Sequence, residues 1–292
     1  MSARMQPTVT TAPKTTPKQI IGSILISVVV IIVLIWTIFP LYWAAISSVK
    51  SSGDNYGNLW LPWVDFQPTL KPWRDMFALP EVRASTIIST QLAIGAATLS
   101  LFLGTLAAYG IARFHFFRPQ NGSLTTWFLS QRIAPPVIFV TPYFLLMRQA
   151  GLLDTTLGLI ILNATFNMTF PIIILTQMFR EVPIEMEEAA QVDGASRWEM
   201  FWRISLPLVA PGLVVAWMLA LAFSWNEFLF AFSSTVANRP LSVAVVGAEQ
   251  TRGVDYQFVG TRTLWAMIVP LIAALLAQRY IVRGLSLGAV KG

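Results

Sequence analysis

The chain has 292 residues, of which 55% are hydrophobic and 12% are charged, against about 25% charged residues in an ordinary soluble domain. This composition excludes a soluble globular protein and predicts an integral membrane protein. Cysteine is absent, which excludes disulfides, thiolate metal sites and cysteine nucleophiles. The net charge of +6 does not indicate nucleic-acid binding, because basic residues near membrane segments serve to orient them.

Six apolar segments predict six transmembrane helices, since the hydrocarbon core of a bilayer takes about 20 helical residues. Three segments contain no Asp, Glu, Lys or Arg: 20–46, 84–112 and 155–179. The other three are about 125–147, about 206–236 and 263–277, of which the last is short. These runs are too continuous for the alternation of an outer-membrane barrel, which repeats in segments of about ten residues. We therefore expect an all-α integral membrane protein whose membrane domain spans residues 20–284.

The N-terminal residues 1–19 are expected to form a cytoplasmic tail. Arg4, Lys14 and Lys18 precede the first span without an acidic residue, and basic residues beside a span favour the cytoplasmic side. The first apolar run is longer than the core of a signal peptide, which takes about 7–15 residues, so we expect it to remain as a span. Six spans then return residues 285–292 to the cytoplasm as a C-terminal tail.

Residues 181–207 form a charge-rich segment between spans four and five, on the cytoplasmic side of this topology. Pro183 suits the first turn of a helix, and the acidic residues after it favour the positive end of the helix dipole. This pattern predicts a short helix over 184–191. Gly194 is expected to end that helix in a positive-φ conformation, and Asp193 is expected to cap the next one.

The second helix of this segment carries an apolar stripe of Trp198, Phe201 and Trp202, which recur at i, i+3 and i+4. Taken alone, the stripe favours a helix lying in the lipid headgroups. A surface that docks on another protein is the alternative. The spacing of the surrounding residues favours this alternative.

Seven residues of the segment stand at the spacing of the EAA loop of ATP-binding-cassette (ABC) importer permeases: Glu188, Ala189, Ala190, Gly194, Ile204, Leu206 and Pro207. The chain therefore resembles the membrane subunits of such importers. This resemblance implies a type I ABC importer permease fold with six transmembrane helices and a cytoplasmic coupling helix, which docks in a cleft of an ATPase subunit. By the same resemblance, the first four residues would form the docking surface and the last three would set the start of span five.

Two further stretches resemble permeases of the carbohydrate (maltose-type) family: SWNEFLFAF at 224–232 and RGLSLGAVKG at 283–292. The resemblance covers the chain from about residue 92 to its end. It implies the import of a sugar, polyol or related glycoside by alternating access. It also implies that the tail at 287–292 reaches into the ATPase dimer.

The chain lacks the G-x-x-x-x-G-K-[ST] phosphate loop, so ATP and Mg²⁺ are expected on partner ATPase subunits. We expect a transport subunit of the bacterial cytoplasmic (inner) membrane with no catalytic residue, metal site or bound cofactor of its own. The resemblance implies three kinds of partner: a second homologous permease, two ATPase subunits and an extracytoplasmic solute-binding protein. Membrane lipid is expected around the chain and nucleic acid is not, while pairing with a second copy of the chain is an alternative.

Three other functions are open at this point. One is a permease of the same superfamily for a non-carbohydrate solute such as phosphate, a polyamine or a peptide. Another is an ion-coupled secondary carrier, which would need no ATPase. A membrane-embedded enzyme is the weakest, because the sequence shows no His/Asp/Glu cluster and its only histidine, His115, lies in a predicted loop.

Polar residues within the predicted spans are candidates for the substrate path: Arg132, Asn163, Asn167, Trp225, Asn226 and Glu227. A charge inside a membrane span needs a partner or water. We favour a structural role for Arg132, in which it bonds carbonyls freed by Pro135 and Pro136. If Arg132 faces the substrate path, its positive charge would instead suit a solute with a phosphate, sulfonate or carboxylate group. The group around Trp225 and Glu227 suits either sugar binding or anchoring at the membrane interface.

Overall fold

The computed structural model describes residues 17–288, apart from gaps at 52, 55–56, 58, 117–119, 247–248 and 251–252. Residues 1–16 of the expected N-terminal tail, with Arg4 and Lys14, and the last four residues of the expected C-terminal tail lie outside the described residues, whereas residues 17–19 begin the first helix. The part of the C-terminal tail that is described continues the last helix.

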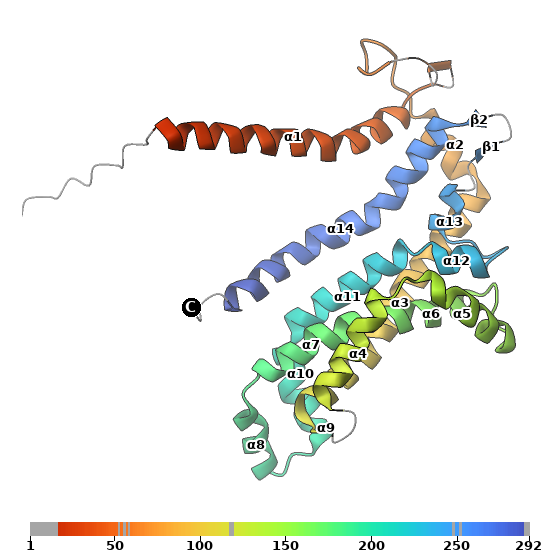
Figure 1. Cartoon of the computed structure of the whole chain (residues 1–292). Helices are drawn as coiled ribbons and strands as arrows, with labels where there is room; N and C mark the ends of the chain where they lie inside the picture. Colours follow the sequence, from red (N-terminus) through yellow and green to blue (C-terminus); the bar gives the residue numbers. More distant parts are fainter. Residues whose placement is uncertain are drawn as a thin grey trace, which may run out of the picture.

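The described chain is almost entirely helical, which confirms the predicted class (Figure 1). The helices in chain order are α1 Pro17–Ser47, α2 Lys71–Ala78, α3 Pro80–Arg113, α4 Asn121–Ile133, α5 Val137–Gln149, α6 Thr156–Asn167, α7 Thr169–Glu181, α8 Ile184–Val192, α9 Arg197–Met200, a π-helical turn Phe201–Ser205, α10 Leu206–Leu208, α11 Ala210–Trp225, α12 Leu229–Ser234, α13 Leu241–Val246 and α14 Tyr256–Gly288. Two short antiparallel strands, β1 Glu249–Gln250 and β2 Gly253–Val254, form a hairpin before α14.

Three helices of the described chain are long and apolar enough to cross a membrane: α1, α3 and α14. Two bent pairs raise this number to five, with a 41° bend between α6 and α7 and a 78° bend between the α9–α10 segment and α11. Pro171 and Pro211 follow these bends, and a proline removes the backbone N–H that would bond four residues earlier. The predicted span 125–147 is likewise divided, into α4 and α5, at Pro135 and Pro136.

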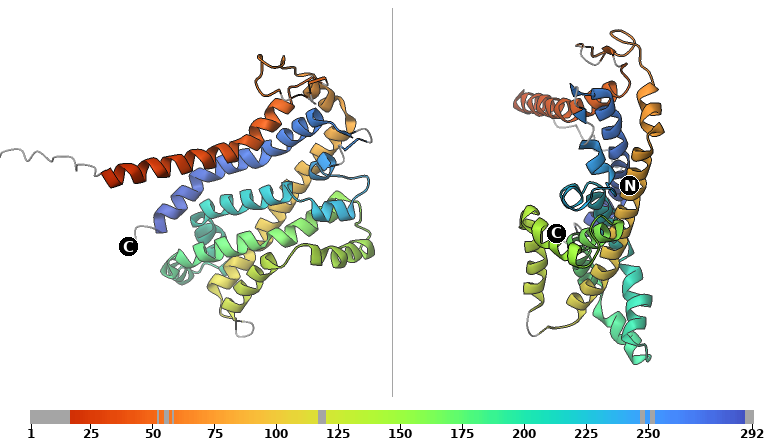
Figure 2. Two further views of the ribbon diagram at one scale, coloured as in Figure 1. Left: turned by 45° about the horizontal axis from the view of Figure 1, so that its top comes forward. Right: turned by 90° about the vertical axis from the view of Figure 1, so that its right-hand side faces the viewer.

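Helix α3 lies at the centre of the arrangement and contacts α6, α7 and α11, while α14 contacts α11 and α1. The two views of Figure 2 show α1 extending away from the other helices with α14 beside it. The most apolar window of α1 is 0% buried. The chain therefore leaves one whole hydrophobic helix to be covered by lipid or by other subunits.

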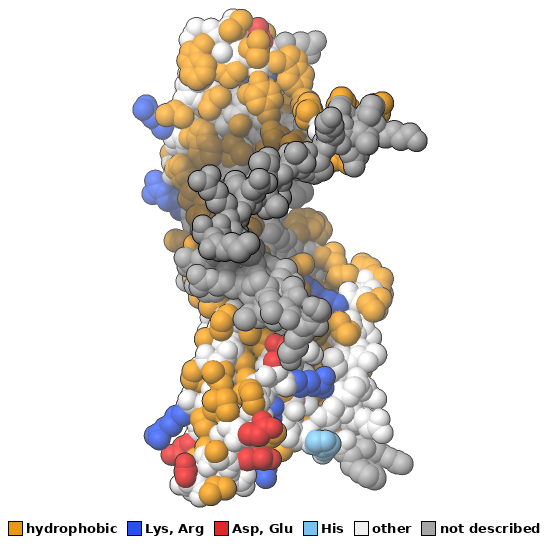
Figure 3. Space-filling view, turned by 90° about the vertical axis from the view of Figure 1, so that its left-hand side faces the viewer, with side chains coloured by type: hydrophobic (Ala, Val, Ile, Leu, Met, Phe, Trp, Pro, Cys, Tyr) orange, Lys and Arg blue, Asp and Glu red, His pale blue; other side chains and the backbone are white. Residues whose placement is uncertain are grey.

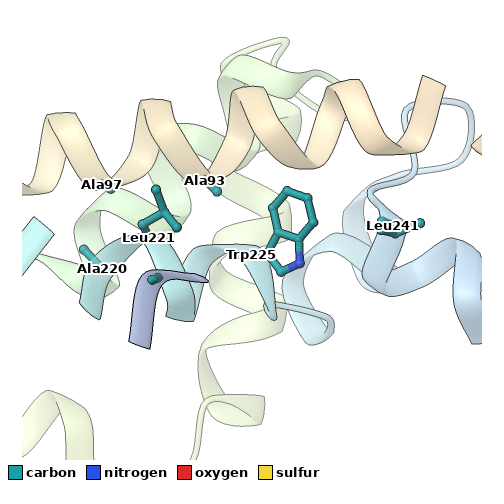
Figure 4. Packing of buried hydrophobic residues seen from close by; sticks show 7 residues of the cluster. Ala93, Ala97, Ala220, Leu221, Trp225 and Leu241 are labelled. Atoms are coloured by element: carbon teal, nitrogen blue, oxygen red, sulfur yellow. The ribbon is translucent and has the colours of Figure 1, made fainter. Parts of the chain in front are cut away.

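Small residues allow α3 and α11 to approach closely. Ala93 and Ala97 of α3 face Ala220 and Leu221 of α11 in one buried cluster, which Trp225 extends (Figure 4). Gly104 of α3 has the same role against α7, since a Cβ placed there would lie 2.5 Å from Pro171. Without a hydrophobic driving force between helices in lipid, such close packing is what holds membrane helices together.

Candidate functional site

The charge-rich segment folds into two short helices at one end of the molecule, as its sequence predicts. Helix α8 covers Ile184–Val192, one residue longer than expected, and Gly194 follows it at φ +86°. A Cβ at Gly194 would meet nothing within 4 Å. The backbone conformation, and not a lack of space, is therefore the reason for glycine here.

The cap of the second helix differs from the prediction. Ser196, and not Asp193, is the N-cap residue of α9: its hydroxyl accepts a hydrogen bond from the Glu199 N–H at 3.3 Å, and the Glu199 carboxylate accepts one from the Ser196 N–H at 3.0 Å. This is a capping box, which satisfies two backbone donors at once. The hydrogen bonds from Ser196, together with nearby Arg203, lower the pKa of Glu199. Asp193 instead ends α8.

The apolar stripe of the second helix is divided between the core and the surface. Phe201 is 2% exposed and packs on Tyr109 with their ring centroids 4.9 Å apart, whereas Trp198 and Trp202 are 59% and 44% exposed. A π-helical turn begins at Phe201. The second helix is thus neither fully buried nor free on the surface. The Phe201 ring packs it against α3, and the Trp198 and Trp202 rings stay exposed.

The expected docking residues lie on the outer side of α8. Glu188, Ala189 and Gly194 are exposed, and Ala190 is half-buried. Residues 184, 188 and 192 recur every four positions, so Glu188 shares its face with Ile184 and Val192, which are 44% and 88% exposed. Figure 3 shows acidic side chains gathered at the lower end of the molecule, where Figure 1 places α8 and α9. The face combines a carboxylate with uncovered apolar side chains.

Of the three residues expected to set the start of span five, Ile204 lies in the π-helical turn, and Leu206 and Pro207 lie in α10. Ile204 and Leu206 are half-buried and Pro207 is exposed. They precede the 78° bend that turns the chain into α11. The segment of α8 and α9 therefore joins α11 through a sharply bent junction.

Sequence reasoning missed the residue that anchors this segment, Glu187. Its side chain is buried, and its carboxylate accepts hydrogen bonds from Arg113 Nε at 2.8 Å, from the Tyr109 hydroxyl at 3.1 Å and from the Ser205 hydroxyl. Arg113 also donates to the carbonyl of Val182 at 2.9 Å. The carboxylate thereby joins α8 to the end of α3 and to the π-helical turn.

The signal for this anchor in the amino-acid sequence is weak. Glu187 reads as one of several acids that favour a helix N-terminus, and Arg113 reads as a basic residue that flanks a span. Their pairing across 74 positions follows only from the packing of α3 against α7, which brings the ends of both helices together. The ion pair lies among the aromatic rings of Tyr109, Phe179 and Phe201.

Three of the six polar residues proposed for the substrate path are buried inside this subunit. Asn163 and Asn167 are 1% and 3% exposed, and Trp225 is 5% exposed. The Asn167 amide donates to the Ser224 hydroxyl at 2.8 Å and the Trp225 indole donates to the Ala266 carbonyl at 2.7 Å. These groups connect helices, because their donors are already used within the chain.

Glu227 is half-buried, and its carboxylate lies at the start of a helix. Its carboxylate accepts hydrogen bonds from the N–H groups of Phe230 at 2.7 Å and Ala231 at 3.1 Å, at the start of α12. The side chain of Asn226 is exposed and donates back to the Ala222 carbonyl at 2.9 Å. Of the two roles considered for this group, the structure favours the anchoring one.

Arg132 makes a different contact from the one we favoured. No hydrogen bond joins it to the carbonyls near Pro135 and Pro136 within the described chain, and its Nη2 atom is buried without a partner there. Its guanidinium instead lies over the rings of Phe170 and Phe223, at 4.2 Å and 4.5 Å from their centroids. The cation is held by cation–π contacts from α7 and α11.

A bundle of interrupted membrane helices that projects an anchored two-helix loop from one end has the architecture of a transporter permease subunit. Residues 79–286 match the family model of the inner membrane component of binding-protein-dependent transport systems. The chain belongs to this family: it is an ABC transporter permease, a membrane transport subunit and not an enzyme.

Its relatives include permeases of named transport systems. The chain is 32% identical over 261 residues to the trehalose transport system permease protein SugB of Mycobacterium tuberculosis, covering 88% of this chain and 93% of that one. It is 28% identical over 265 residues to the sulfoquinovosyl glycerol transport system permease protein SmoH of Agrobacterium fabrum, covering 89% and 91%.

Among solved structures, the fold is similar to a chain of a bacterial ABC transporter involved in the import of the acidic polysaccharide alginate. The TM-score is 0.78 at 21% sequence identity, over 92% of this chain and 99% of that chain. At this identity the likeness concerns the fold alone, and it supports the expected type I importer permease architecture.

Proposed function

We propose that this chain is the permease subunit of an ATP-driven importer for a sugar, polyol or related glycoside, and that it couples to a cytoplasmic ATPase through residues 181–207. The observation that carries the coupling role is the construction of α8. Its inner side is fixed to α3 by the buried Glu187–Arg113 pair, and its outer side presents Glu188 between exposed Ile184 and Val192. A rigid inner side and an uncovered outer side suit a helix that receives a force from a partner.

The carbohydrate class rests on the relatives. The named systems of SugB and SmoH carry trehalose and sulfoquinovosyl glycerol, both glycosides. A phosphate, polyamine or peptide permease is the remaining alternative within the family. Membership of an ABC family argues against an ion-coupled carrier.

The proposal includes the rest of the transporter. A second homologous permease completes the path, two ATPase subunits supply ATP and Mg²⁺ sites, and an extracytoplasmic binding protein delivers the solute. The chain crosses the bacterial inner membrane six times, with the broken pair α4–α5 as one crossing and both termini in the cytoplasm. The uncovered helix α1 is consistent with such an assembly.

A pair of variants at one exposed position tests the coupling role. Asparagine and aspartate both tolerate the left-handed backbone of Gly194 better than other residues do, and they differ by one charge. We expect Gly194→Asp to insert into the membrane and keep the second permease but to lose the ATPase subunits and solute uptake. Gly194→Asn should keep the ATPase subunits and solute uptake.

The measurement is purification in mild detergent through a tag on this chain, followed by identification of the subunits that accompany it. Uptake in proteoliposomes with the binding protein and candidate sugars then identifies the solute. A chain that purifies alone and takes up solute with an ion gradient would contradict the proposal.

A further inference from the structure

Three helix breaks meet around Arg132. Helix α4 ends one residue after it, α7 begins one residue before Phe170, and α11 ends two residues after Phe223. The rings of Phe170 and Phe223 lie 4.7 Å apart and both contact the guanidinium. In membrane transporters, interrupted helices at one level are where solutes and ions bind, because backbone groups are released there.

The charge of Arg132 has no counter-ion in the described chain. The two ion pairs there are Arg113–Glu187 and Arg203–Glu199, and neither includes it. Two aromatic rings offer a negative face but no lone pair on oxygen, so Nη2 keeps an unused donor in a buried position. The residue as a whole is half-buried, and the Phe223 ring is 49% exposed. The site is therefore electrically incomplete and open on one side.

We propose that Arg132, Phe170 and Phe223 form a subsite for an anionic group of the transported solute, a carboxylate, sulfonate or phosphate. The planar guanidinium can bind such a group through two parallel hydrogen bonds. The two rings keep water away from one face of the cation, which strengthens its attraction for an anion. The inference deepens the import function proposed above and rests on it.

A carboxylate of a neighbouring subunit could supply the same chemistry, so the experiment must distinguish the two sources. The chain contains no cysteine, so Ala134→Cys places a single thiol of this chain at the break, two residues from Arg132. In the purified whole transporter, its labelling rate is measured with an anionic reagent, 2-sulfonatoethyl methanethiosulfonate, and with its cationic trimethylammonium analogue. The unsubstituted chain controls for thiols of the other subunits.

An uncompensated cation attracts the anionic reagent and repels the cationic one. We expect the ratio of the two rates to fall by about tenfold when Arg132→Gln is added, and to be kept by Arg132→Lys, since one charge at a few ångströms has an effect of this size at an intermediate dielectric constant. A ratio that Arg132→Gln leaves unchanged means that a partner carboxylate already neutralises the cation, or that the site is closed, and overturns the proposal.

Glucuronate and glucose then test the class of solute, because they differ by a carboxylate in place of a hydroxymethyl group. At constant ionic strength, glucuronate should slow labelling with the anionic reagent while glucose should not, and the protection should disappear in Arg132→Gln. Equal protection by both sugars, or by neither, overturns the subsite. ATPase subunits in the same preparation report on the import function separately, so a failed subsite is not mistaken for a failed permease.

Discussion

Arg113 and Arg132 are two cations in the last turns of their helices, α3 and α4, and their partners differ. Arg113 reaches the carboxylate of Glu187 at 2.8 Å and the carbonyl of Val182 at 2.9 Å. Among the residues that the structure describes, Arg132 contacts the rings of Phe170 and Phe223 and has no hydrogen-bond or ion-pair partner. A charge whose partners lie within the chain fixes the structure, whereas a charge without them remains available to something outside the chain.

The largest effect is expected from breaking the paired site. Glu187→Ala leaves Arg113 buried without its counter-ion, which typically costs about 3–5 kcal/mol. The thermal midpoint of the purified complex should fall sharply, or the subunit should fail to accumulate. Glu185→Ala is the matched control, because Glu185 lies on the same helix and is exposed, and it should leave the midpoint unchanged.

The double variant Glu187→Leu with Arg113→Met tests separately whether the ion pair is needed for stability and whether it is needed to join α8 to α3. Replacing both partners of a buried pair with apolar residues is often neutral or stabilising, so the midpoint should recover. ATPase activity stimulated by the loaded binding protein should stay low, because the ion pair no longer joins α8 to α3. Full recovery of coupling would show that packing alone transmits the movement.

A smaller effect is expected at Gly194, which fixes the geometry between the paired site and the ATPase. Alanine at φ +86° costs about 1–2 kcal/mol, although nothing would clash with its Cβ. Gly194→Ala should therefore lower the thermal midpoint slightly and reduce coupling, and Gly194→Asn should do so less. Equal losses in both variants would point to crowding by the ATPase and not to backbone strain.

For Arg132 the expected change in stability is about 1 kcal/mol or less. Arg132→Met removes a cost of about 2.5–3.5 kcal/mol for a charge in the membrane and loses two cation–π contacts of about 0.5–2 kcal/mol each, and these nearly cancel. The thermal midpoints of this variant and Arg113→Met should differ clearly. A loss at Arg132 as large as that at Arg113 would reveal a counter-ion on another subunit.

The smallest effect concerns a carboxylate near the surface, Asp154. Partial burial would raise the pKa of Asp154, but hydrogen bonds from the N–H groups of Ala237, Asn238 and Val236 outweigh it and lower that pKa. Because the folded value is depressed, the stabilisation is complete above the ordinary value of about 4 and is lost as pH falls below it. Protection of the amides at 236–238 against hydrogen exchange, relative to the intrinsic exchange rate at each pH, should therefore fall below about pH 4, and Asp154→Asn should remove this dependence.

The helical class, the family and the loop at 181–207 could be predicted from the sequence, because each depends on local information. Hydropathy over about 20 residues selects membrane helices, and the EAA spacing lies within one short segment. The helix over 184–191 and the positive φ at Gly194 were predicted correctly for the same reason. The cap at Ser196 was missed although Ser196 and Glu199 form a recognisable local pattern.

The residue roles within the membrane could not be predicted in this way. Asn163, Asn167 and Trp225 looked free because the sequence does not show which of their donors are used, and the structure pairs them with Leu159, Ser224 and Ala266. The sequence also does not show that the Glu227 carboxylate accepts hydrogen bonds from backbone N–H groups at the start of α12. Ser224 and Ala266 became partners through the packing of separate helices, whereas Leu159 lies in the same helix as Asn163 and the N–H groups bound by Glu227 are three and four residues away.

The sequence alone determined that this is a helical membrane protein with an exposed, charge-rich loop at 181–207, because hydropathy, proline positions and a fixed motif act over short distances. Only the tertiary structure decided which charges are paired. Glu187 finds Arg113 across 74 positions because α3 and α7 end side by side, and Arg132 is left with two rings because three helices break around it. Burial and pairing are properties of neighbours in space, and the sequence records them only indirectly.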